Sequence, residues 1–236
     1  LLFADVGSIA ISPAMRADTP YDSIRDFAPV TLAVSSPFVL VVQPAVPAKS
    51  LAEFVDYAKQ RPGKVTYGSF GNGSIAHLAG AMLQSLVPGL ELLHVPYKGA
   101  TPVIADLLGG QIDASFISVA SATPHLDSGK MRGLAVTTTT RSRQLPSLPA
   151  IGEQFAGYEV NSWYGMFAPA RTPTDVVARL HKDIAACFAD PELVKSLQVR
   201  GFTADATTPE AFSAKIKQEV TRWATVVKAA GLVGAN

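Results

Sequence analysis

Apolar residues recur along this chain with two different spacings, and the spacing predicts which segments form strands and which form helices. Apolar runs rich in β-branched residues predict β-strands at 1–4, 30–34, 38–43, 65–68, 92–95, 112–117, 131–136, 158–161 and 163–167. Apolar residues spaced three and four apart predict amphipathic helices between these strands and in the last third of the chain. Residues 5–8 are expected to form a turn, and residues 9–20 to continue into a Pro-rich loop.

Capping residues indicate where several of the predicted helices begin. Ser50 and Glu53 have the spacing of a capping box, and Pro62 with Gly63 ends the helix that they start. An N-cap residue followed by proline in the first helical position starts three C-terminal helices, at Thr172, Asp190 and Thr208. Further helices are expected at 75–86, 102–108 and 118–127.

Strands and helices alternate between residues 38 and 136. This alternation predicts a parallel α/β sheet with right-handed crossover connections. Ligands of such sheets bind outside the carboxyl ends of the strands. A glycine-rich turn at residues 69–74 follows one of the predicted strands, and we expect it to lie at that edge.

The stretch from Tyr67 to Leu78, YGSFGNGSIAHL, carries the clearest chemical signal in the chain. Its glycines allow positive φ angles and close approach of a ligand to the backbone. A helical apolar period starts at Ile75, and the first N–H groups of a helix lack partners and lie at the positive end of its dipole. Such a turn can bind a carboxylate or a phosphate. It is neither a Walker loop nor a convincing dinucleotide fingerprint, and most turns of this kind bind nothing.

Composition and charge exclude several classes of protein. The chain has 236 residues, of which 48% are hydrophobic, enough for one large domain or two lobes. A net charge of +1 gives no electrostatic basis for binding nucleic acid or an anionic membrane surface. No apolar run approaches the roughly 18 residues that span a bilayer. Cys187 is the only cysteine, which excludes an intramolecular disulfide and a cysteine metal cluster.

The chain begins at Leu1 in what resembles the inside of a buried strand, without an initiator Met or a visible signal peptide. We therefore expect further residues upstream of position 1. Without such residues, the strand at 1–4 would expose apolar surface and an unpaired edge. An exposed edge of this kind favours self-association.

Several other residues have both a functional and an ordinary structural interpretation. His77 follows Ser74 by three residues and either lines a pocket or hydrogen-bonds the turn. Ser69 lacks a Gly-x-Ser-x-Gly context and an assignable His–carboxylate pair, so nucleophilic catalysis is not expected. Trp163 and Tyr164 either fill the core or line a cleft. His94, His125 and His181 do not have the spacing of metal ligands. We therefore expect each of them to be structural or exposed.

Six short stretches occur in the order in which one known family has them, and they are distributed across essentially the whole chain. They are YDSIRDFAPV at 21–30, GSFGNGSIAHL at 68–78, HVPYKG at 94–99, DLLGGQID at 106–113, GLAVT at 133–137 and SWYGMFAP at 162–169. The chain thereby resembles the tripartite tricarboxylate transporter substrate-binding proteins, also called Bug receptors. Each stretch is weak by itself, but the ordered series is specific.

This resemblance implies a two-lobed periplasmic binding protein with the type II α/β fold and an N-terminally truncated first lobe. The first lobe would comprise residues 1–35 and 166–236, and the second lobe residues 38–162. Such a protein closes on a small organic carboxylate and delivers it to the membrane permease of a tripartite tricarboxylate transporter. It needs no cofactor or metal and is not an enzyme.

Family members hold the carboxylate between two loops, largely through backbone N–H groups and water. The second-lobe loop matches residues 69–74, whereas the first-lobe loop belongs to a segment that this sequence does not contain. Asp5 and Phe116–Ile117–Ser118 depart from the usual family residues at places that face the cleft, and Asp5 there would favour a ligand with a donor or cationic group. The candidate ligand-binding residues are Ser69, Gly71, Asn72, Gly73, Ser74, His77, Asp5, Ser8, Ser118, Trp163 and Tyr164.

Two other classes of function stay open on the residues alone. A ligand-sensing regulatory domain has the same α/β architecture, although it is normally fused to a DNA-binding helix pair that this sequence lacks. An enzyme acting on an anionic substrate, such as a phosphate ester, could use the glycine-rich turn, although no acid–base set can be named for it.

Overall fold

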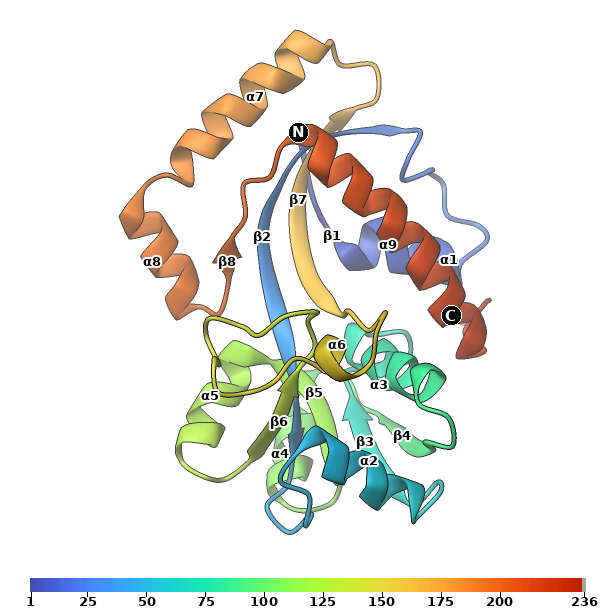
Figure 1. Cartoon of the computed structure of the whole chain (residues 1–236). Helices are drawn as coiled ribbons and strands as arrows, with labels where there is room; N and C mark the ends of the chain where they lie inside the picture. Colours follow the sequence, from blue (N-terminus) through green and yellow to red (C-terminus); the bar gives the residue numbers. More distant parts are fainter. Residues whose placement is uncertain (235–236) are drawn as a thin grey trace. The chain divides into compact units, whose positions relative to one another are not determined.

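The computed structural model describes residues 1–234 and divides the chain into two compact units (Figure 1). The first unit combines Leu1–Ser36 with the chain from Ser162 onward, and the second unit is Pro37–Asn161. Two strands, β2 (Phe27–Val42) and β7 (Asn161–Pro169), carry the chain from one unit to the other.

The second unit is built on a sheet with the strand order β6-β2-β5-β3-β4. Strands β3 (Val65–Ser69), β4 (Leu92–Pro96) and β5 (Ala114–Ser118) are mutually parallel. Strand β2 is antiparallel to both β5 and β6 (Arg132–Val136). The prediction of a wholly parallel sheet is therefore wrong for one strand. The reason is topological, because β2 enters from the first unit and starts at the edge where the other strands end.

Strand β2 is a single strand of 16 residues, where the sequence predicted two strands, at 30–34 and 38–43. Ser35 pairs with Thr203 in the first unit, and Phe38 pairs with Ser118 in the second. The intervening Pro37 favours an extended conformation of the residue before it. The polar pair that suggested a break, Ser35 and Ser36, is buried within the strand.

Five helices belong to the second unit: α2 (Leu51–Lys59), α3 (Ile75–Leu86), α4 (Ala100–Leu108), α5 (Val119–Asp127) and α6 (Ile151–Gln154). Ser50 caps α2 as predicted, since its Oγ accepts a hydrogen bond from the Glu53 N–H at 3.2 Å. The Glu53 carboxylate accepts from the Lys49 N–H at 2.8 Å, not from the N–H of Ser50. Helix α4 begins two residues earlier than predicted, after Gly99 with φ +113°.

Residues 158–160 form no strand, contrary to the prediction for 158–161. Tyr158 and Val160 are fully buried, but side-chain and loop hydrogen bonds hold them in place of a ladder. The Tyr158 hydroxyl donates to the Ala79 carbonyl at 3.2 Å, and the Val160 N–H donates to the Thr137 carbonyl at 2.8 Å. The apolar pattern at Tyr158 and Val160 therefore reflects burial of the segment that connects α6 to β7, and not a strand.

The first unit contains strands in the order β1-β7-β2-β8, with β1 at Leu2–Asp5 and β8 at Thr203–Ala204. Strand β1 is antiparallel to β7, and β8 is antiparallel to β2. The long C-terminal helix α9 (Pro209–Ala229) packs against the helical segments that follow β1 (Figure 1). Its buried apolar face consists of Phe212, Ile216, Trp223, Val226 and Val227.

Residues 7–15 are helical, where the sequence predicted a turn and a loop. A π-helical turn, η1 (Gly7–Ile11), leads into α1 (Ser12–Met15). The Asp5 carboxylate accepts hydrogen bonds from the N–H of Ser8 at 2.9 Å and from its hydroxyl at 2.7 Å. These bonds satisfy donors at the start of η1, and the contact of η1 with α9 buries its apolar residues.

Helices α7 (Thr174–Cys187) and α8 (Pro191–Val199) precede β8. Asp190 and Thr208 cap α8 and α9 as predicted, each with proline in the first helical turn. Helix α7 differs from the prediction, because Pro173 occupies its N-cap position and Thr174 is its first residue.

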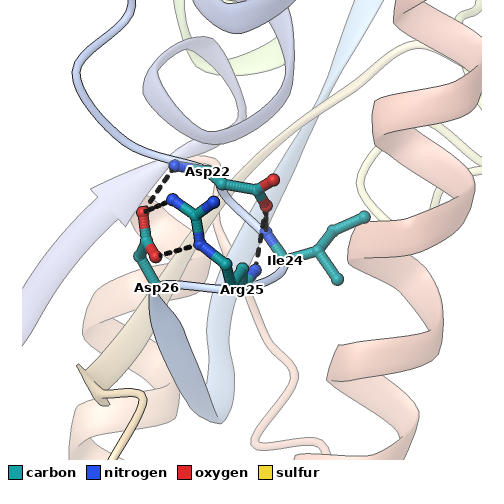
Figure 2. A network of polar contacts seen from close by, with 4 residues as sticks. All are labelled: Asp22, Ile24, Arg25 and Asp26. Atoms are coloured by element: carbon teal, nitrogen blue, oxygen red, sulfur yellow. Dashed lines mark hydrogen bonds and ion pairs between the residues drawn. The ribbon is translucent and has the colours of Figure 1, made fainter.

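The loop before β2 is closed by a network of charged side chains (Figure 2). Asp22 Oδ1 accepts from the N–H groups of Ile24 and Arg25, and Asp26 accepts from the Asp22 N–H at 2.8 Å. The Arg25 guanidinium contacts both oxygens of Asp26 and, with the Asp22 N–H, lowers the Asp26 pKa to about 2. Because these groups are exposed, the network shapes the loop and adds little stability.

Candidate functional site

The glycine-rich turn, residues 69–74, connects the carboxyl end of β3 to the first turn of α3. Gly71 and Gly73 have φ angles of +130° and +73°, a region that other residues rarely adopt. Ser74 is the N-cap of α3 and accepts from the His77 N–H at 3.4 Å. The predicted strand, turn and helix start are therefore all present.

Hydrogen bonds within the turn converge on the Gly71 carbonyl. It accepts from the Ser74 hydroxyl at 2.7 Å, the Ser74 N–H at 3.2 Å and the Ser69 hydroxyl at 3.0 Å. Ser69 is fully buried beneath the turn, whereas Asn72 is exposed at its tip. The turn is thus held in one shape by its own serines.

Three backbone donors at the mouth of α3 have no protein partner. Within residues 1–234, no acceptor is hydrogen-bonded to the N–H of Asn72, Ile75 or Ala76. Ala76 is fully buried, and buried backbone donors are seldom left unpaired in folded proteins. Free donors of this kind, at the positive end of a helix dipole, can bind an anionic oxygen.

The N–H of Gly73 is not one of these free donors. It donates to Nδ1 of His77 at 3.1 Å. His77 is buried, with 8% of its surface exposed, so it supports the turn from below. The sequence left two roles open for His77, lining a pocket or hydrogen-bonding the turn. The structure contains the hydrogen bond to the turn.

His94, on β4, is a second histidine beneath the turn, and its Nε2 lies 2.6 Å from the Ser69 hydroxyl. Its ring stacks on that of His77, with the ring centroids 3.7 Å apart and the planes inclined by 7°. His94 is not among the candidate residues that the sequence indicated. Its position three residues into a predicted strand gave no sign of this contact.

The contact between Ser69 and His94 does not form a catalytic pair. Burial and the adjacent His77 lower the His94 pKa to about 4, too low for an effective general base near neutral pH. Within residues 1–234, no carboxylate is hydrogen-bonded or ion-paired to His94. The Ser69 hydroxyl also donates to the Gly71 carbonyl at 3.0 Å, so its proton is not directed toward His94.

Ser118 ends β5, the parallel neighbour of β3. Gly68 is opposite Ser115 in this pair, so both strands end at the same edge of the sheet. The Ser118 hydroxyl caps α5 by accepting from the Ser121 N–H at 3.3 Å, and it donates to the Ser121 hydroxyl at 2.8 Å. This edge is where open α/β sheets bind their ligands.

The candidates in the first unit gather around a hollow of about 420 Å³. Asp5 and Ser8 line it, together with Tyr164, which is opposite Asp5 in the β1–β7 pair and stacks on Phe3 at 5.7 Å. The remaining walls are largely apolar: Leu2, Phe3, Ala4, Ile9 and Phe27.

Tyr21 also lines the hollow, although no signal in the sequence indicated it as a site residue. Its hydroxyl donates to the Ser8 carbonyl at 2.5 Å. Burial and the Asp5 charge raise the pKa of the Tyr21 phenol. The Asp5 carboxylate is therefore the negatively charged group of the hollow, and it disfavours further negative charge there.

Trp163 is separate from this hollow. Its side chain is fully buried and packs edge-on against Phe212 at 5.4 Å. In this structure, Trp163 is a core residue of the first unit, and Tyr164 is its neighbour on the exposed side of β7.

We expect the change Ser74→Ala to lower the free energy of unfolding by about 0.5–2 kcal/mol, the usual effect of losing an N-cap. The Gly71 carbonyl keeps two other donors, so the turn should survive. Affinity for a bound carboxylate should fall by only about 0.5–1.5 kcal/mol, as for one ordinary hydrogen bond. Urea unfolding and calorimetric titration measure the two effects. A loss of binding with unchanged stability would show that the hydroxyl itself contacts the ligand.

Neither a membrane span nor a metal site is found in the described part of the chain. No helix within residues 1–234 has the length and apolarity that crossing a membrane requires. The same residues contain no group of three or more His, Cys, Asp or Glu side chains that could hold a metal ion.

Two α/β units joined by two shared strands are the architecture of the two-lobed periplasmic binding proteins of type II, to which solved structures similar in fold belong. Residues 2–232 match the model of the tripartite tricarboxylate transporter family receptors, described as TctC. The chain belongs to this family.

Known relatives are similar over most of the chain. It is 38% identical over 210 residues to a protein from the tcbD–tcbE intergenic region of Pseudomonas sp. strain P51, and it covers 62% of that relative. A solved R. palustris protein with adipate is 33% identical to this chain, with a TM-score of 0.80. The match covers 97% of this chain and 77% of that protein. MatC from Rhodopseudomonas palustris, with bound malate, is 25% identical with a TM-score of 0.75, over 95% of this chain and 78% of MatC.

Proposed function

We propose that this protein is an extracytoplasmic solute receptor that captures a small organic carboxylate and delivers it to a membrane permease of a tripartite tricarboxylate transporter. The single observation that carries the proposal is the cluster of unpaired donors at the start of α3. The N–H groups of Asn72, Ile75 and Ala76 point to an anionic ligand and need no cofactor. The relatives solved with adipate and with malate support a carboxylate.

Binding of this kind requires only geometry and charge. Donors that are already fixed in the turn bind a carboxylate without the entropic cost of ordering a loop. Closure of two lobes by hinge bending, as in periplasmic binding proteins, would then remove the carboxylate from water and strengthen its hydrogen bonds.

The two alternative functions have less support. A regulatory ligand-sensing domain would use the same edge, but the family match is to transport receptors. An enzyme acting on a phosphate ester would need a general base, and the histidine beside Ser69 has a pKa too low for that task.

Native mass spectrometry of the purified protein, combined with a melting-shift screen, tests the proposed function. The screen comprises hexanoate, glutamate, glutamine, adipate, malate and citrate, with glucose 6-phosphate as the phosphate ester. We expect a bound carboxylate or a melting shift with at least one organic acid, and no turnover of the phosphate ester. Hydrolysis of the ester, or the absence of both a bound carboxylate and a melting shift with any of the acids, would contradict the proposal.

The charge of Asp5 leads to a prediction about the ligand. Asp5 lines the hollow of the first unit, and a carboxylate there favours a ligand with a donor or cationic group and opposes further negative charge. We expect a monocarboxylate or an amino- or amide-bearing acid to bind more tightly than citrate. The change Asp5→Asn should narrow this difference in the melting-shift screen. Tighter binding of citrate than of every monocarboxylate and amino acid would contradict the prediction.

A further inference from the structure

We propose that His77 and His94 form a stacked pair that sets the shape of the glycine-rich turn from below and thereby positions its free N–H groups. The inference rests on the proposed function, because it concerns how the carboxylate receptor is held. Neither histidine needs to touch the ligand. Both are positioning residues that act through Gly73 and Ser69.

Each histidine holds a different end of the turn. Nδ1 of His77 accepts from the Gly73 N–H at 3.1 Å, at the residue whose φ of +73° turns the chain into α3. Nε2 of His94 is 2.6 Å from the Ser69 hydroxyl, which also contacts the Gly71 carbonyl and N–H. The pair therefore contacts the turn at its first residue and at its last glycine.

Stacking couples these two contacts. The imidazole rings lie 3.7 Å apart and are nearly parallel, and the Tyr67 ring packs against the His94 ring at 5.0 Å with its plane tilted by 35°. The Tyr67 hydroxyl donates to the His77 carbonyl at 3.2 Å. Helix α3 and strand β4 are thereby joined beneath the turn, so its two ends cannot move independently.

The contact with Gly73 determines the protonation state of His77. An N–H group can donate only to a ring nitrogen without a proton, so His77 must be neutral with its proton on Nε2. Burial lowers the pKa of His77, and burial together with His77 lowers the His94 pKa to about 4. Among residues 1–234, the other titratable side chain in ring contact with the pair is Tyr67, whose pKa is raised by burial.

The stack is therefore neutral at pH 7. Because the folded-state pKa values lie below the ordinary histidine value of 6.5, the unfolded state binds more protons as the pH falls. The contribution of the pair to stability is complete above about pH 6.5 and is lost as the pH falls toward 4. Protonation of His77 at Nδ1 would also oppose the Gly73 N–H directly.

Asparagine and glutamine substitutions separate this positioning role from simple packing. The asparagine side-chain oxygen lies where histidine has Nδ1, whereas the glutamine amide reaches the position of Nε2. We expect His77→Asn and His94→Gln to bind adipate within about threefold of the parent protein. His77→Gln and His94→Asn should bind it about tenfold more weakly, the effect of an unsatisfied buried donor or acceptor. A packing role would rank asparagine and glutamine in the same order at both positions, and that result would overturn the proposal.

Nuclear magnetic resonance of the ligand-free protein gives a readout that does not depend on adipate. The Gly73 amide proton should shift upfield in His77→Gln but not in His77→Asn, and should follow the titration of His77. In the parent protein, nitrogen spectra of the imidazoles should show His77 protonated on Nε2 only. A proton on Nδ1 of His77, or an unchanged Gly73 amide in His77→Gln, would overturn the proposal. If none of the acids of the melting-shift screen binds the parent protein while these signals follow the prediction, the carboxylate function fails and the positioning role stands.

Discussion

The change Gly73→Pro is expected to abolish carboxylate binding in calorimetric titration. Proline fixes φ near −65°, whereas Gly73 has a φ of +73°, so the chain cannot follow the same path into α3. Proline also removes the N–H that donates to His77. The path of the turn that carries the free donors is therefore lost, and no binding is expected at ligand concentrations that saturate the parent protein.

Gly89→Pro is a matched control for this change. Gly89 has a φ of +76° in the exposed turn after α3, with no atom within 4 Å of the position that a side chain would occupy. The change Gly89→Pro imposes the same conflict, a φ near −65° where the backbone has a positive φ, at the opposite end of the helix. We expect its affinity to equal that of the parent protein. Unchanged binding by Gly73→Pro, or equal losses in the two variants, would show that the turn is not the anchor.

The second large effect concerns the core of the first unit. We expect Phe212→Ala to lower the free energy of unfolding by about 3–5 kcal/mol, as for other buried aromatic truncations. Phe212 is fully buried and packs against Trp163 and Phe167, with ring centroids 5.4 and 5.1 Å away. A side chain at Gly165 would overlap the same ring, so Gly165→Ala should cost about 1–3 kcal/mol by overpacking.

The double variant Gly165→Ala with Phe212→Ala should cost less than the sum of the two single changes. The new methyl group enters the space that the ring has left, so the two effects are coupled. Urea unfolding followed by tryptophan fluorescence measures all three free energies, since Trp163 and Trp223 lie in this core. Additive costs would contradict the close contact between Gly165 and Phe212.

Local signals predicted most of the elements, because caps and periodicity act within a few residues. Ser50, Asp190 and Thr208 mark helix starts that the structure contains, and the apolar face of α9 follows its periodicity. The errors depend on partners distant in the chain. The continuity of β2 comes from pairing with β8 and β5, and its direction comes from its passage between units. Neither property is encoded in the residues near Ser35.

The glycine-rich turn was predictable for the same reason, since its glycines, its cap and its helix lie within ten residues of one another. Its support by His94 was not, because Ser69 and His94 are 25 positions apart and meet only when β3 pairs with β4. The hollow around Asp5 likewise needs Tyr164 from a strand distant in the sequence. Trp163 is next to Tyr164, which lines the hollow. Neighbouring residues on a strand point to opposite faces, so Trp163 lies in the core.

Backbone amide spectra recorded during a carboxylate titration test the central claim most directly. The probe is the acid that gives the largest melting shift among those named above. We predict that the amide protons of Asn72, Ile75 and Ala76 move downfield together, with one saturation curve, as they form hydrogen bonds to the carboxylate. The exposed turn amide of Gly89 should not move. Saturable binding that leaves all three amides unchanged would contradict the placement of the carboxylate at the start of α3.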